Sequence, residues 1–179
     1  MNPARFAHIL LLVPSLLFAQ EVKNTSYIAS SGEKVLRLEA VVPISRADAW
    51  KLFSTEDGLK KWIAPVVSLD FRVGGSILTN YDSTKSTRDP GTIHLPILNF
   101  LDGEMLTLRV ELNEHFAQSV RDQDRNLQEI IQLVDMGNGQ TRIISNMVGW
   151  GNGPEWDKTY NFFARGNDWT FRHMLGLFR

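Results

Sequence analysis

The chain has 179 residues, with 19 Lys and Arg, 20 Asp and Glu, and a formal net charge of −1 at pH 7. Hydrophobic residues make up 43% of it, which suits one folded domain and argues against a wholly disordered chain. A nearly neutral chain lacks the basic surplus that nucleic-acid binding requires, and the absence of cysteine excludes disulfides, thiolate metal sites and cysteine nucleophiles.

Residues 1–19 have the pattern of a secretory signal peptide. Residues 1–5 end in the positive charge of Arg5, residues 6–18 are largely apolar, and Ala19 follows. As a helix the apolar run would span about 20 Å, less than the roughly 30 Å of a bilayer core. A buried N-terminal helix and an uncleaved anchor are the alternatives. We predict cleavage after Ala19 and a secreted or periplasmic protein, with no membrane span after cleavage.

The next segment is predicted to separate the cleavage site from the domain. Residues 20–34 are rich in Ser, Thr, Asn and Gly, a composition typical of a flexible leader. The folded domain is then expected at residues 35–179. Residues 35–42 alternate and contain β-branched side chains, which predicts a first strand that ends at Pro43.

Two short helices are predicted after this strand. Ser45 is a candidate N-cap for the first, because a serine hydroxyl can accept a bond from a free backbone N–H of the first turn. Residues 56–63 form the second, with Trp62 among its apolar residues and Pro65 just beyond its end.

Six further strands follow in hairpin order, separated by turns that contain glycine. Pro96 interrupts one of them, which indicates an edge position or a bulge. The polar residues 82–91 and 115–126 are predicted to be loops. The six strands are expected at residues 66–71, 76–81, 92–100, 104–113, 127–135 and 141–150.

The C-terminal residues 154–177 predict one long helix. Pro154 sits where a helix can begin, no later proline interrupts it, and apolar residues recur at three- and four-residue steps. The order of elements predicts an α+β fold, in which a seven-stranded curved antiparallel sheet carries two short helices and one long C-terminal helix. A helix that closes a curved sheet leaves an interior gap, and such gaps hold ligands.

Three stretches of the chain are similar to a known family. They are residues 43–53 with 62–65, residues 71–76, and residues 139–143 with 149–151 and 155–157. Together they resemble the AHSA1-like (activator of Hsp90 ATPase homologue 1-like) branch of the SRPBCC (START/Bet v 1-like) superfamily, over roughly residues 35–178. The resemblance implies a helix-grip fold. Met147 departs from the polar or histidine residue that the family often has there.

The resemblance also bears on partners. The family name suggests a chaperone, but an exported protein does not meet a cytosolic one, so Hsp90 is not an expected partner. The superfamily sometimes supplies enzymes of the cyclase or hydrolase kind, and these use acids, tyrosines or histidines in the cavity.

Candidate site residues follow from the expected cavity. Glu129 points inward if it shares a face with Ile131, and the opposite phase, with Ile130 inward, remains open. His94 is the best single polar candidate, with a surface histidine as the alternative. The aromatic stripe on the last helix is either ordinary core or pocket wall. The candidate ligand-binding residues are Trp62, His94, Glu129, Ser145, Met147, Trp156, Tyr160 and Phe163.

The sequence carries no recognised catalytic motif. The four histidines never occur at helical spacing, so we predict no metal site, no cofactor and no catalytic residue. A pair among Glu104, Glu111 and Glu129 is an alternative for acid–base chemistry. We expect an exported domain that binds or carries a small apolar or amphipathic molecule. The alternatives are a cavity-based enzyme and a protein-interaction module without a ligand.

Overall fold

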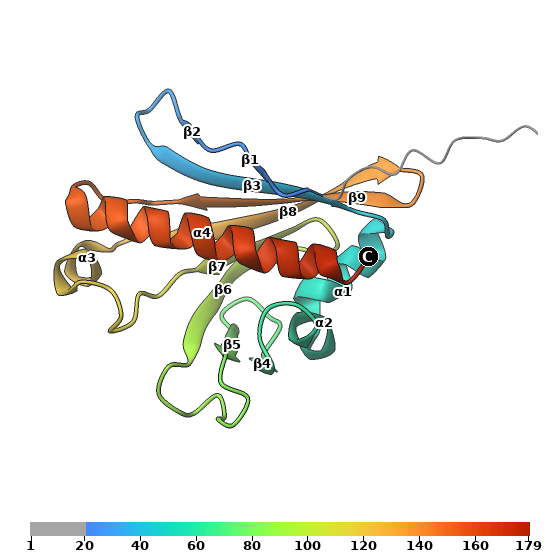
Figure 1. Ribbon diagram of the computed structural model, residues 1–179, viewed down its shortest axis with the longest axis horizontal. Helices are drawn as coiled ribbons and strands as arrows, with labels where there is room; N and C mark the ends of the chain where they lie inside the picture. The colour runs from blue at the N-terminus through green and yellow to red at the C-terminus, as the bar shows by residue number, and fades with distance from the viewer. Residues whose placement is uncertain (1–20) are drawn as a thin grey trace, which may run out of the picture.

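A computed structural model describes residues 21–179 of the chain. The predicted signal peptide therefore lies outside the described residues. These residues form a curved antiparallel sheet with one long helix across it (Figure 1). The strands are β1 (Lys23–Asn24), β2 (Tyr27–Ile28), β3 (Lys34–Val42), β4 (Val66–Leu69), β5 (Ser76–Asn80), β6 (Ile93–Leu101), β7 (Met105–Arg109), β8 (Gln128–Gly137) and β9 (Gln140–Val148).

The strands are ordered β1-β3-β9-β8-β7-β6-β5-β4, with β2 also paired to β3. From β4 to β9, each strand pairs antiparallel with its successor, as expected for a chain of hairpins. β3 pairs with β9, which joins an early strand of the described chain to its last one. This arrangement confirms the predicted α+β helix-grip fold.

Four helices complete the described fold: α1 (Arg46–Ser54), α2 (Glu56–Lys60), α3 (Gln118–Gln123) and α4 (Pro154–Gly176). The predicted cap at Ser45 is present, since its side chain accepts a bond from the backbone N–H of Asp48. Thr55 caps α2 in the same way, through the N–H of Gly58. Helix α3 lies in a segment predicted to be a loop; it buries Val120, and one apolar side chain is too weak a pattern to predict a helix.

The sheet has nine strands, so the predicted seven are two too few. The two additional strands lie in the predicted flexible leader. β1 and β2 pair with the outer edge of β3, and Val22 is buried in the main core. A polar segment can therefore be ordered by the unpaired edge of a neighbouring strand, which supplies backbone hydrogen bonds whatever the side chains are.

Pro96 lies on an interior strand, at a position that pairs only with β5 and just before a bulge, so each of the two alternatives describes part of what is observed. β6 pairs with β5 through residues 93–96 and with β7 from Ile97 onward, with a register shift between Ile97 and Asn99. The missing N–H of proline therefore falls where the strand changes partners, and no ladder bond is lost to β7.

Helix α4 is held at its two ends. In its first turn Trp156 is buried in a cluster with Leu36 and Met147, and its indole N–H donates to Gln123 Oε1 at 2.9 Å. In its last turns Phe171 and Met174 belong to the main core. Between Thr159 and Phe171, none of the helix residues is fully buried. The middle of α4 therefore spans the concave side of the sheet without packing tightly on it.

Candidate ligand-binding cavity

A cavity of about 520 Å³ lies where the middle of α4 crosses the sheet. This size falls within the range of small-molecule sites in proteins. Most of the wall is apolar, and the strands contribute to it through alternate residues, as a pleated sheet requires. The strand residues of the wall include Ile77 and Thr79 from β5, Ile93 and Leu95 from β6, Leu106 and Leu108 from β7, and Ile131 from β8.

Glu129 is the one carboxyl group that the cavity wall carries on the central strands. Its cross-strand neighbours are Leu108 on β7 and Met147 on β9, so the flanking side chains in its row are apolar. Ser145 lies diagonally across on β9, and its hydroxyl donates to Glu129 Oε1 at 2.5 Å. Glu129 is half-buried: it borders the cavity, and apolar neighbours enclose it on both sides along the sheet.

This enclosure changes the acidity of the site. Burial raises the pKa of Glu129 above its ordinary value, because the charged form loses hydration, and the bond from Ser145 opposes the rise. Tyr81 also lines the cavity. Although 49% of Tyr81 as a residue is accessible, burial of its hydroxyl raises its pKa; a hydrogen bond with Thr170 lowers the pKa, and the carboxyl of Glu129 raises it. Glu129, Tyr81 and Thr170 thus form a polar group within an apolar wall.

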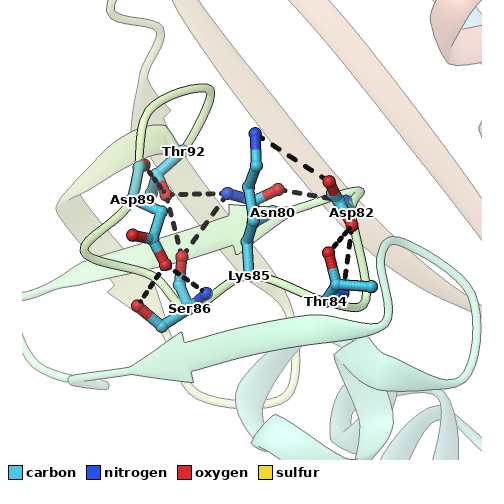
Figure 2. Close-up of polar contacts among 7 residues, drawn as sticks. All are labelled: Asn80, Asp82, Thr84, Lys85, Ser86, Asp89 and Thr92. Atoms are coloured by element: carbon cyan, nitrogen blue, oxygen red, sulfur yellow. Dashed lines mark hydrogen bonds and ion pairs between the residues drawn. The ribbon is translucent and has the colours of Figure 1, made fainter.

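The loop between β5 and β6 forms part of the cavity rim and has its own polar framework (Figure 2). The side chain of Asn80, itself buried, donates to Thr92 Oγ1 at 3.2 Å and to the carbonyl of Ser86 at 3.4 Å. Asp89 accepts bonds from the backbone and side chain of Ser86. These bonds tie the two ends of the loop together, and Tyr81 and Gly91 within it reach the cavity.

The raised pKa of Glu129 gives an expected pH dependence of stability. The folded protein binds this proton more tightly than an unfolded chain with a pKa near 4.5, so the contribution of Glu129 to stability is fully present below pH 4.5 and is lost as the pH rises through the folded-state pKa. In Glu129→Gln this fall is absent. The variant should therefore gain stability relative to the wild type on going from acidic to neutral pH, as measured by urea unfolding.

Glu114→Gln, which removes an exposed carboxyl outside the cavity wall, is the control for loss of charge alone. A difference between wild type and Glu129→Gln that stayed constant across this pH range would contradict the raised pKa.

Four of the predicted ligand-binding residues line the cavity: Trp62, Glu129, Met147 and Phe163. Glu129 shares the inward face with Ile131, so the first of the two phases considered for this strand is the observed one. Ser145 is on this same face, opposite Ile131, but it is buried and contacts the cavity wall through its bond to Glu129.

The structure places the other three predicted residues away from the cavity wall. His94 is exposed, because it alternates along β6 with the inward-facing residues Ile93 and Leu95. Its Nδ1 lies 2.8 Å from the Glu111 carboxylate. Trp156 is packed core at the first turn of α4. Tyr160 packs edge-on against Trp150, with ring centroids 5.0 Å apart. The aromatic stripe is therefore core at one end and cavity wall at Phe163.

Several cavity residues were not predicted. Asn167 and Thr170 do recur on the helical stripe, and polar residues on an inward stripe are a usable signal for a hollow. The Asn167 side chain donates to the sulfur of Met147 at 3.2 Å. Tyr81 ends the predicted strand 76–81 and continues the alternation of Ile77 and Thr79, which also line the cavity, so this pattern was a usable signal. Phe116 lies on a loop, where no periodicity indicates which way a side chain points. Phe116 stacks parallel to Phe163, with centroids 5.4 Å apart.

Within residues 21–179, no group of three or more His, Cys, Asp or Glu side chains is arranged to hold a metal ion. No helix in that range is both long and apolar enough to cross a bilayer.

Comparisons with known proteins agree with this architecture. The family model described as "Activator of Hsp90 ATPase homolog 1-like protein" matches residues 43–174, and no curated protein matches the chain. Among solved structures, the Aha1 dimer from Colwellia psychrerythraea is 18% identical, covers 80% of this chain and 92% of its own, and has a TM-score of 0.59.

Two other solved structures are similar at comparable levels. Protein MLL2253 from Mesorhizobium loti is 15% identical, covers 80% of this chain and 95% of its own, and has a TM-score of 0.63. Protein Ms6760 from Mycobacterium smegmatis is 13% identical, covers 88% of this chain and 97% of its own, and has a TM-score of 0.61. At these identities the likeness concerns the fold alone.

Proposed function

The chain belongs to the activator of Hsp90 ATPase homolog 1-like family, and from this premise we propose that it is an exported domain that binds or carries a small apolar or amphipathic molecule. The fold of this family commonly forms ligand-binding cavities. The observation that carries the proposal is the hollow beneath the middle of α4, whose two ends are packed into separate clusters.

An unfilled apolar hollow of this kind is energetically unfavourable. Its lining side chains lack partner atoms on one side and lose the corresponding dispersion contacts. A ligand of suitable size restores those contacts, so occupancy and stability are coupled. A protein-interaction module without a ligand would be expected to have a filled interior, so the hollow does not favour that alternative. The alternative of a cavity-based enzyme rests on Glu129 and Tyr81, and conversion of a bound molecule would distinguish it from binding.

Two measurements on the purified protein test binding directly. Native mass spectrometry should detect a co-purified small molecule. Titration with Nile red, a neutral dye whose emission depends on its surroundings, should give saturable binding that competes with that molecule. A protein with neither a co-purified molecule nor saturable dye binding would contradict the proposal.

Phe163→Ala should weaken ligand binding and cost less stability than truncation of a fully packed phenylalanine. Truncating a fully packed phenylalanine costs about 3–5 kcal/mol, but Phe163 is half-buried and borders the cavity, so we expect about 2 kcal/mol. The dye should bind several-fold more weakly, because the lost ring is part of the wall. Urea unfolding and dye titration measure the two effects.

Tyr160→Ala is the matched control on the same helix. Tyr160 is also a half-buried aromatic residue, but it packs on Trp150 outside the cavity wall. It should lose a similar amount of stability and keep the dye affinity of the wild type. Equal dye binding by both variants would remove Phe163 from the site.

Export is proposed on the amino-acid pattern of residues 1–19. Cell fractionation and sequencing of the mature N-terminus test it. We expect a mature chain that begins after Ala19, whereas a cytosolic protein that retains Met1 would overturn export and reopen a chaperone partnership.

A further inference from the structure

The cavity wall contains acidic side chains but no lysine or arginine among the described residues. Tyr81, Glu111, His115 and Glu129 line the cavity. Glu111 and His115 are exposed at the rim, and the Glu111 carboxylate already contacts His94 at 2.8 Å. Glu129 is therefore the acidic group that a molecule inside the cavity would meet, and the cavity wall supplies no basic side chain to balance it.

The cavity wall around Glu129 offers hydrogen-bond acceptors to a ligand. Ser145 donates to Glu129 Oε1, and it is the only hydrogen-bond donor to this carboxyl within the described residues, so Oε2 is available. One N–H of the Asn167 amide donates to the sulfur of Met147, and its carbonyl oxygen is an acceptor that a ligand can use. Met147 is the cross-strand neighbour of Glu129, so the two acceptors belong to one region of the wall.

The rest of the wall suits a cation with an apolar body. Aromatic rings from Trp62, Phe163 and Phe171 line the cavity, and the faces of aromatic rings attract cations as well as apolar groups. A buried carboxylate without a basic partner is costly, and a ligand that brings the missing positive charge removes that cost. A ligand carboxylate would instead add a like charge.

We propose that the cavity binds an apolar molecule bearing a protonated amine, with the ammonium group at Glu129 and Asn167 and the apolar body against the aromatic wall. The inference rests on the proposed binding function and specifies its ligand class. When Glu129 is protonated in the free protein, binding of the ammonium ion ionises the carboxyl group and releases that proton to solvent. The pair that forms is a charge-assisted hydrogen bond, which is stronger than a neutral one.

Three probes with the same eight-carbon chain test the inference: octylamine, octanol and octanoate. In isothermal titration at neutral pH, octylamine should bind most tightly, octanol about tenfold more weakly, and octanoate most weakly. Glu129→Gln should weaken octylamine by about tenfold and leave octanol within about twofold. Its amide keeps an oxygen that can accept the bond from Ser145.

The pH dependence of the wild type provides a second measurement that does not depend on a variant folding. Octylamine affinity should rise with pH as Glu129 loses its proton, and octanol affinity should not. The groups that face Glu129 from the packed elements are Tyr81, Ser145, Asn167 and Thr170, with Glu111 and His115 at the rim. Any pH dependence that persists in Glu129→Gln belongs to the rim groups.

The outcomes separate the two proposals. Failure of all three probes to bind would contradict the proposed binding function itself. If octanol and octanoate both bind, and their affinities equal or exceed that of octylamine, the binding function stands but the amine selectivity is overturned. An unchanged octylamine affinity in Glu129→Gln, with a flat pH profile in the wild type, would overturn it as well.

Discussion

Replacing Gly149 with alanine should destabilise the protein by about 3 kcal/mol or more. Gly149 has a φ of +87°, and a Cβ atom there would lie 2.1 Å from the carbonyl oxygen of Asn126. Both the left-handed backbone and the steric conflict disfavour a side chain. The neighbouring backbone cannot move away easily, because the N–H of Leu127 donates to Asp124 and its carbonyl accepts from Val110.

Gly139→Ala is the matched control. Gly139 has a φ of +72° in the β8–β9 turn, and an added Cβ would meet no atom within 4 Å. It should cost about 1–2 kcal/mol, the backbone strain alone. Urea unfolding of both variants measures the difference, which reports the close approach of the β9 exit to the start of β8. Equal losses would mean that the two backbones separate without cost, contrary to the packing described.

Filling the cavity should abolish most ligand binding while the fold remains intact. Thr170 lies on α4, lines the cavity and is half-buried. In Thr170→Trp the indole would occupy space that a ligand needs, so dye affinity should fall by about a hundredfold, or roughly 3 kcal/mol. Stability should stay within about 1.5 kcal/mol of the wild type, because a side chain that enters an existing hollow avoids much of the overpacking cost of a dense core.

Asn161→Trp controls for the added tryptophan, since Asn161 is exposed on the same helix and does not line the cavity. Its dye affinity should match that of the wild type. Dye titration by fluorescence and thermal unfolding give both readouts. Retention of tight dye binding by Thr170→Trp would mean that the dye binds at an exposed apolar surface, and would remove the main support for a ligand in the hollow.

The close approach at Gly149 also explains part of the family pattern. In Gly149-Trp150-Gly151, a Cβ atom on Gly151 would lie 2.1 Å from the indole nitrogen of Trp156. The two glycines therefore allow the chain to leave β9, pass the start of β8 and turn into α4 against a buried tryptophan. Trp150 between them donates from its indole nitrogen to the carbonyl of Met147 at 3.0 Å. The pattern is structural, and it positions the first turn of the helix that covers the cavity.

The order and type of the main elements could be predicted because they depend on local patterns. Alternation in residues 128–137 and 140–148, turn glycines and the unbroken stripe of residues 154–176 specify strands and a helix through the geometry of the backbone. The strands β1 and β2 could not be predicted in this way. They form because the edge of β3 offers backbone hydrogen-bond partners. A polar segment of a few residues has no periodicity from which such pairing could be predicted.

The site, too, could be predicted only in part. The amino-acid sequence by itself determined that a helix carrying Phe163 would cross a curved sheet carrying Met147, and it left open the phase of the strand that contains Glu129. Only the tertiary structure decided the phase, through the register of Glu129 with Leu108 and Met147. It also decided where the aromatic stripe changes from core to cavity wall. The position of this change depends on the distance between the helix and the sheet. Packing at the two ends of α4 sets that distance, and no local sequence pattern encodes it.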